Sequence, residues 1–284
     1  MSRTYRFSIV DVFTSVRFQG NQLGVFTNAV GLTDEQMQSL ARELNFSETT
    51  FVFPAEQGGD VRMRIFTPAH ELPFAGHPVL GTAFAMAGPL QSILMRIETP
   101  GGIVPVALER EGAKIVFGRM SQPIPTVALF DTALADELFA ALGVNGSELP
   151  VELYDNGVPH VFVALRSDAE VAALKPDFAR LEAIVGDTGV NCFAASGDRV
   201  KTRMFAPDMG MAEDPATGSA AGPLAVHLAR HGAIAWGDEI LISQGAEIGR
   251  PSTLFARAEG SADAITLVEV GGSAVVVGRG EFVV

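Results

Sequence analysis

The sequence has a single cysteine and no long apolar run. Cys192 has no second cysteine with which to form an intramolecular disulfide, so we expect a reducing compartment. No stretch of 18 or more apolar residues is present, which argues against a membrane-spanning helix. Residues 1–6 lack the apolar core of a signal peptide. We therefore expect a soluble protein of the cytoplasm.

Basic residues are also scarce. Lys and Arg number 20 against 33 Asp and Glu, which gives a formal net charge of -13. No run of Lys or Arg is long enough to track a phosphate backbone, so nucleic acid and anionic membranes are not expected partners. Hydrophobic residues make up 48% of the 284 residues and charged residues 19%, a composition that favours a large buried core over disorder.

Several motifs for catalysis or cofactor binding are missing. The sequence contains no P-loop, no G-x-G-x-x-G between a strand and a helix, no G-x-S-x-G and no H-E-x-x-H. His227 and His231 stand four apart, a spacing that can bind a metal, but we place them on the polar last turn of a helix. Cys192 lies in an apolar stretch and is predicted to be a core residue. No metal site is expected.

The two halves of the chain share a motif. Residues 64–68 read R-I-F-T-P and residues 203–207 read R-M-F-A-P; each is followed by E-x-P-x-x-G, at residues 71–76 and 213–218. The offsets are 139 and 142 residues, which indicates two copies of one unit, although chance similarity of turn residues is the alternative. A Pro-rich stretch at 121–126 marks the linker. We predict domains at 1–122 and 127–284, with the last strand able to cross to the first half.

Each half is predicted to form many short strands and two helices. A capping box at Thr33 opens a surface helix over 33–44, and residues 178–185 form its counterpart. Apolar helices over 78–87 and 220–230 are expected to be buried. The fold class is therefore α+β, with a curled sheet around a central helix in each half. Strands are expected at 5–13, 23–26, 50–53, 62–66, 95–99, 103–108, 114–117, 161–165, 203–205, 239–242, 253–256, 264–270 and 273–278.

The repeated motif ends where each buried helix begins. Gly76 and Gly218 precede the two helices, so their first N–H groups could bind an anion such as a carboxylate. Two such helix ends facing one another across a cleft would hold a small carboxylic acid. Glycine turns that serve only packing are the alternative.

Ionisable groups flank these turns, and they differ between the copies. Asp214 corresponds to Leu72, and His77 corresponds to Ser219. Broken symmetry in a duplicated protein is where we expect chemistry, and a histidine can shuttle a proton near neutral pH. A helix-capping His77 and a solvated Asp214 are the structural alternatives.

Two more polar residues are candidates. Glu48 stands between a helix and an apolar strand; if it points inward, burial suits a carboxyl to general acid/base work. A solvent-facing Glu48 fits the local sequence equally well. Asn21 could hydrogen-bond a substrate or be an ordinary turn residue.

Taken together, these segments resemble the PhzF family of phenazine biosynthesis. The similarity rests on G-N at 20–21, S-E-T-T-F at 47–51, E-L-P-F-A-G-H-P at 71–78 and E-D-P-A-T-G-S-A-A-G at 213–222, and it extends to 244–251. The resemblance implies a diaminopimelate epimerase-like fold, with two β-barrels each around a helix. It also implies a homodimer that works without a cofactor.

The resemblance further implies an isomerase acting on trans-2,3-dihydro-3-hydroxyanthranilate. Glu48 takes the family's acid/base position, with His77, Asp214 and Ser219 around the substrate and Gly76 and Gly218 offering N–H groups. Two other functions fit the same residues. One is isomerisation or epimerisation of another small amino or hydroxy acid, and the other is binding of a carboxylate without turnover.

Overall fold

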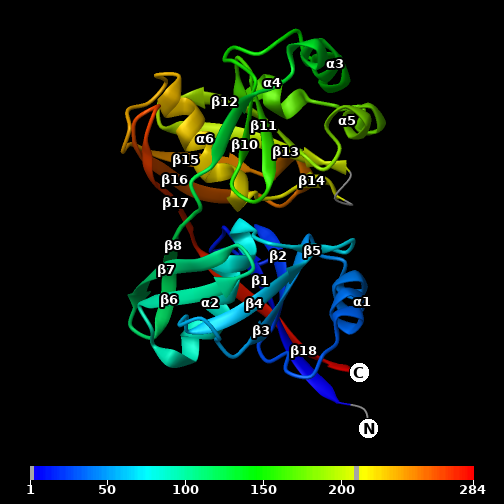
Figure 1. Cartoon of the computed structure of the whole chain (residues 1–284), viewed down its shortest axis with the longest axis vertical. Coiled ribbons are helices and arrows are strands. Elements are labelled where there is room, and N and C mark those ends of the chain that lie inside the picture. The colour runs from blue at the N-terminus through cyan, green and yellow to red at the C-terminus, as the bar shows by residue number, and fades with distance from the viewer. Residues whose placement is uncertain (1–2, 208–210) are drawn as a thin grey trace. The chain divides into compact units, whose positions relative to one another are not determined.

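The computed structural model describes residues 3–207 and 211–284 and divides into two compact units. The first unit contains Met1–Ser121 and Gly271–Val284, and the second contains Gln122–Val270. Figure 1 shows the elements of both, coloured along the chain. Among the described residues, none of the helices combines the length and the apolarity that a membrane span needs.

The first unit is a strongly curved mixed sheet around one helix. Its strands pair antiparallel except for the parallel pairs β2–β3 and β4–β6. The elements are β1 (Thr4–Val12), β2 (Asn21–Phe26), α1 (Asp34–Leu44), β3 (Glu48–Phe53), β4 (Val61–Phe66), β5 (Glu71–Leu72), α2 (Gly76–Leu90), β6 (Leu94–Thr99), β7 (Gly102–Glu111), β8 (Lys114–Ser121) and β18 (Ala274–Val283).

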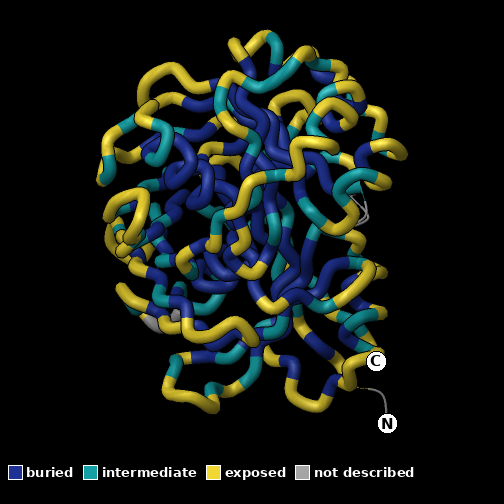
Figure 2. The backbone as a smooth tube through the Cα atoms, turned by 45° about the horizontal axis from the view of Figure 1, so that its top comes forward, coloured by how far each residue is buried: buried dark blue, intermediate teal, exposed yellow. Residues whose placement is uncertain are grey.

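Helix α2 is the centre of this unit. It contacts β1, β2, β3, β6, β7, β8 and β18, so strands surround it on most sides. Its sequence is apolar nearly all round, as a fully enclosed helix requires. Gly81 lets the helix approach the sheet closely, because a Cβ there would lie 2.6 Å from Leu23 and 2.7 Å from Val12. Figure 2 shows buried backbone inside the unit and exposed backbone in the turns.

Helix α1 covers the outer side of the same sheet. The predicted capping box is present, with the Thr33 hydroxyl accepting from Gln36 N–H and the Gln36 side chain accepting from Thr33 N–H. Met37 and Leu40 pack against Phe51 and neighbouring aromatic residues. The helix ends at Asn45, whose φ of 52° turns the chain into β3.

The second unit repeats this order of elements. Strands β11–β12 and β13–β15 are its parallel pairs, in the places of β2–β3 and β4–β6. The elements are β9 (Thr126–Leu129), α3 (Thr132–Leu142), β10 (Glu152–Asp155), β11 (Pro159–Ala164), α4 (Asp168–Ala173), α5 (Phe178–Val185), β12 (Gly189–Ser196), β13 (Arg199–Ala206), β14 (Met211–Asp214), α6 (Gly218–Arg230), β15 (Glu239–Gln244), the 3-10 turn η2 (Ala246–Ile248), β16 (Ser252–Gly260) and β17 (Ile265–Gly272).

One salt bridge recurs in both units and confirms the repeat. Arg64 binds Glu71 with Nε–Oε1 and Nη2–Oε2 distances of 2.6 Å each. Arg203 binds Glu213 through the same atoms, at 2.9 and 2.7 Å. Each arginine also lies over the phenylalanine two residues further on, at 5.1 and 5.0 Å from the ring centre. The pair therefore fixes the short strand that leads into the buried helix in each unit.

The second unit departs from the prediction of one surface helix per half. Besides α5, it has α3, which begins after the N-cap Asp131, and α4, which begins after the N-cap Ser167. Leu138, Val171 and Leu181 of the three helices share one core cluster with the sheet. The strand β12 was not predicted either. Its first six residues are all buried, so the sequence lacks the alternation of apolar and polar residues that marked the predicted strands.

Candidate functional site

Glu48 is buried at the start of β3. It follows the turn at the end of α1, and the residue is only 8% exposed. The solvent-facing alternative is therefore wrong, and the carboxyl points into the unit. A carboxyl in such a place can exchange protons with a bound molecule while water is largely excluded.

His77 and Asn21 lie beside Glu48. His77 Nε2 is 3.2 Å from Glu48 Oε2, although the pair is not aligned for a hydrogen bond. His77 Nδ1 is 3.3 Å from Asn21 Nδ2, and the Ser47 hydroxyl donates to Asn21 Oδ1 at 3.2 Å. Burial lowers the pKa of His77 to about 3, against an opposing hydrogen bond with the Gln22 backbone. The imidazole is therefore neutral beside the carboxyl.

Gly76 opens α2 next to these side chains. The N-cap residue Ala75 provides no side-chain acceptor for the first N–H groups of the helix. Those N–H groups and the helix dipole favour an anion at this end. The first unit thus brings together four of the predicted residues: Glu48, His77, Asn21 and Gly76.

Asp214 is the last residue of β14 in the second unit and is 4% exposed. Its Oδ2 accepts a hydrogen bond from the Thr217 hydroxyl at 2.6 Å. The Gln244 amide donates to the Asp214 carbonyl at 2.8 Å and to the Thr217 hydroxyl at 2.9 Å. These bonds hold a buried carboxyl at the start of α6, so the solvated-loop alternative is wrong.

Gly218 and Ser219 form the first turn of α6 and are held by buried side chains. Gln122 Nε2 donates to the Gly218 carbonyl at 2.7 Å, and Asn156 Nδ2 donates to the Ser219 carbonyl at 2.9 Å. The Ser219 hydroxyl lies 2.9 Å from His160 Nε2. The second unit therefore brings Asp214, Gly218 and Ser219 to one helix end.

Several of these supporting residues were not predicted from the sequence. They are Gln122, Asn156, His160, Thr217 and Gln244, together with Asn191, whose Nδ2 lies 3.3 Å from His160 Nδ1. The sequence contained a signal for His160, because it is a polar residue within the apolar strand P-H-V-F-V-A. The structure buries it completely. Thr217 lies inside the repeated motif itself.

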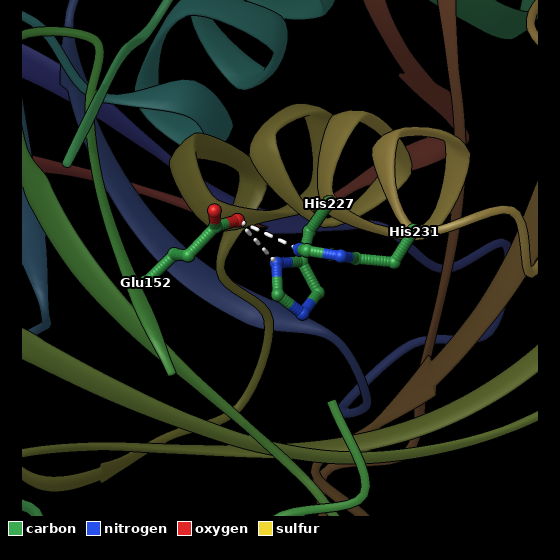
Figure 3. A group of neighbouring side chains, drawn as sticks. All are labelled: Glu152, His227 and His231. Atoms are coloured by element: carbon green, nitrogen blue, oxygen red, sulfur yellow. Dashed lines mark hydrogen bonds and ion pairs between the residues drawn. The ribbon is translucent and has the colours of Figure 1, made fainter. Parts of the chain in front are cut away.

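One group among the described residues has the donor set for a metal ion. Figure 3 shows His227 of α6 and His231, the residue that follows this helix, directed toward Glu152 of β10. Their ligand atoms lie within 4.8 Å of one another. The carboxylate also accepts a 2.6 Å hydrogen bond from the Tyr154 hydroxyl, and Arg230 Nη2 lies 3.6 Å from its other oxygen. Glu152 is thus neutralised and hydrogen-bonded by protein groups.

Burial corrects the expectation for His227 and confirms the expectation for Cys192. His227 is completely buried rather than placed on a polar turn, and burial lowers its pKa. Burial disfavours the charged form of Glu152, but hydrogen bonds from His227, Tyr154 and His231 hold its pKa well below the ordinary value. Cys192 is a core residue as predicted, and burial raises the pKa of its thiol.

Comparison with known proteins places the chain among characterised relatives. A family described as phenazine biosynthesis-like protein matches residues 10–280. The chain is 50% identical over 279 residues to the trans-2,3-dihydro-3-hydroxyanthranilate isomerase of Pseudomonas chlororaphis, covering 98% of this chain and 99% of that protein.

Solved structures show the same fold. A PhzF-family phenazine biosynthesis protein of Bacillus anthracis matches with a TM-score of 0.85 and 26% identity, covering 99% of this chain and 100% of that chain. A hydroxyproline epimerase from Agrobacterium vitis, with bound trans-4-hydroxy-L-proline, matches with a TM-score of 0.69 and 15% identity, covering 99% and 91%. The expected α+β fold of the epimerase type is therefore confirmed.

Proposed function

Because the chain belongs to the phenazine biosynthesis-like family and is an isomerase, we propose that its reaction is the isomerisation of trans-2,3-dihydro-3-hydroxyanthranilate. The observation that carries the proposal is a buried carboxyl, Glu48, beside the neutral imidazole of His77 in a chain half identical to an enzyme of that activity. Proton transfer on a small acid needs a base of this kind and no redox partner.

Glu48 is proposed to carry the proton. In its ionised form it removes the hydrogen from C3 of the ring, which leaves a delocalised anion, and it returns the same proton to C1. The double bonds shift between these carbons, so no atom is gained or lost. One residue suffices for both transfers, and C1 receives the same proton when water does not exchange with it faster than the return step.

The helix ends are proposed to hold the substrate's polar groups. N–H groups at Gly76 and Gly218 suit the carboxylate and the negative charge that develops during transfer. His77 and Asp214 orient or exchange protons with the amino and hydroxyl substituents, and Ser219 and Asn21 donate hydrogen bonds. The protein is further proposed to act as a cytoplasmic homodimer without a cofactor or metal.

Turnover in deuterated water tests the proposal. Purified protein is incubated with trans-2,3-dihydro-3-hydroxyanthranilate, and substrate loss and deuterium at C1 are followed by NMR and mass spectrometry. Conversion of this substrate supports the proposal, and deuterium in the product reports how far the carried proton exchanges with solvent. No conversion by folded protein would overturn it. Turnover of another small amino or hydroxy acid would then favour the epimerase alternative.

A further inference from the structure

Strand register shows what stands in the second unit where the first has Glu48. Thr49 of β3 pairs with Phe66 of β4, and Val190 of β12 pairs with Phe205 of β13. Phe66 and Phe205 are equivalent positions of the repeated R-x-F-x-P motif. The residue before Thr49 is Glu48, and the residue before Val190 is Gly189. The second unit therefore has no side chain at the position of the proposed proton carrier.

A histidine from the neighbouring strand occupies that space. His160 of β11 pairs with Gly189, as Leu23 of β2 pairs with Glu48. A Cβ built on Gly189 would lie 2.7 Å from His160 Nδ1, so the imidazole fills the place of a side chain at 189. A carboxyl beside a histidine in the first unit thus corresponds to a histidine beside a serine in the second.

The partners of His160 set the direction of its hydrogen bonds. Burial lowers the pKa of His160 to about 3, so the ring is neutral and carries one N–H. Asn191 Nδ2 lies 3.3 Å from Nδ1 and can only donate, which makes Nδ1 the acceptor. The proton is then on Nε2, which donates to the Ser219 hydroxyl oxygen at 2.9 Å. The hydroxyl hydrogen of Ser219 is consequently directed away from His160.

We infer that His160 is a positioning residue that makes the Ser219 hydroxyl a hydrogen-bond donor to an oxygen of the bound acid. Asn191 fixes the histidine tautomer. His160 donates to the Ser219 hydroxyl oxygen, so the hydroxyl hydrogen cannot point toward His160. This inference rests on the proposed function, since it deepens the role of Ser219. It predicts that His160 affects the reaction only through residue 219.

A double-variant cycle tests this dependence. His160→Phe removes the donor at similar volume, and His160→Gln retains an N–H. We expect His160→Phe to lower kcat/KM by about 10-fold to 100-fold, the usual effect of a residue that orients a functional group, and His160→Gln to lose less. In a Ser219→Ala background, His160→Phe should cause less than about a 2-fold further loss. His70→Phe, at an exposed position, is the control.

Gly189→Ala provides a second route if His160→Phe does not fold. It removes no polar group, but the added methyl group displaces the His160 ring, because it would lie 2.7 Å from Nδ1. The value of kcat/KM should therefore fall when Ser219 is present and stay unchanged in the Ser219→Ala background. Thermal unfolding of each variant separates loss of fold from loss of rate. Losses that multiply independently of residue 219, or His160→Phe within 2-fold of wild type, would overturn the inference.

Binding separates this inference from the proposed reaction. 3-Hydroxyanthranilate has the same ring substituents but no hydrogen to migrate, so its affinity can be measured by calorimetry in all variants. If wild type binds this probe without turning over the substrate, the reaction is wrong, and coupling between residues 160 and 219 in probe affinity still supports the inference. Independent effects on affinity would overturn it. A wild-type protein that neither binds nor reacts would overturn both.

Discussion

Glu48→Gln separates proton transfer from binding. Gln has nearly the same shape, so the substitution fits a position that is 8% exposed. Because His77 is neutral, removal of the Glu48 charge does not leave the neighbouring imidazole as an unpaired cation. We therefore expect the free energy of unfolding to change by less than about 1 kcal/mol, which corresponds to a shift of roughly 2–4 °C or less in Tm.

The rate should respond far more strongly. A Gln side chain cannot accept the C3 proton, and positioned acid/base groups contribute about 10² to 10⁴-fold. We expect kcat to fall by at least about 10³-fold, or roughly 4 kcal/mol of barrier, while 3-hydroxyanthranilate binds within about 3-fold of wild type. Glu43→Gln, an exposed acid of α1, is the matched control. A Glu48→Gln enzyme within 10-fold of wild type would refute the assignment.

Four other perturbations test the site and the fold. Asp214→Asn and His77→Ala should each lower kcat/KM by about 10²-fold in steady-state assays; near wild-type rates for both would remove them from the site. Arg203→Met should lower the free energy of unfolding in urea by about 3 to 5 kcal/mol, because it leaves the buried Glu213 carboxylate unpaired, and an unchanged midpoint would contradict this. Burial lowers the pKa of His77 and His160 from 6.5 to about 3, so the unfolded chain binds protons that the folded chain does not. Above pH 6.5 both histidines are neutral in the folded and unfolded states, so stability is highest there. As pH falls toward 3 the unfolded chain is protonated first, and the free energy of unfolding falls by about 2 kcal/mol per histidine at pH 5. Urea unfolding at pH 7.5 and 5 measures it, and His160→Gln should reduce the difference. Chelators should change neither activity nor Tm; release of one equivalent of metal, measured by mass spectrometry, would contradict a metal-free Glu152 group.

The sequence carries the local part of the site well. Glu48, His77 and Asp214 each stand next to a glycine turn or a strand start, and the structure buries all three. The positions of these residues were visible in the sequence, but the burial of Glu48 and Asp214 was not, because a solvent-facing carboxyl was an open alternative for both. The burial of helices α2 and α6 could be predicted from the sequence, because a helix that is apolar nearly all round is buried in the interior.

Long-range pairing accounts for what the sequence did not reveal. His160 and Ser219 are 59 residues apart, and Gln122 and Gly218 are 96 apart. Such contacts depend on strand register, because a slip of one residue turns each side chain to the other face of the sheet and abolishes the contacts. The substitution of a histidine on β11 for a carboxyl on β3 follows only when Gly189 and His160 are seen to face one another. Propensity and periodicity contain no such information.

The pairing of β18 with β1 delays the folding of the first unit during synthesis. The first unit contains residues from both sides of the second unit along the chain, and the strand pair from Thr4–Val283 to Val12–Ala274 closes it. A ribosome adding about 5–20 residues per second makes residue 271 roughly 8 to 30 s after residue 121. During that interval β1 has an open edge, while the second unit is a continuous segment that can fold as it emerges. Nascent chains are therefore most exposed to mispairing in the half that carries Glu48.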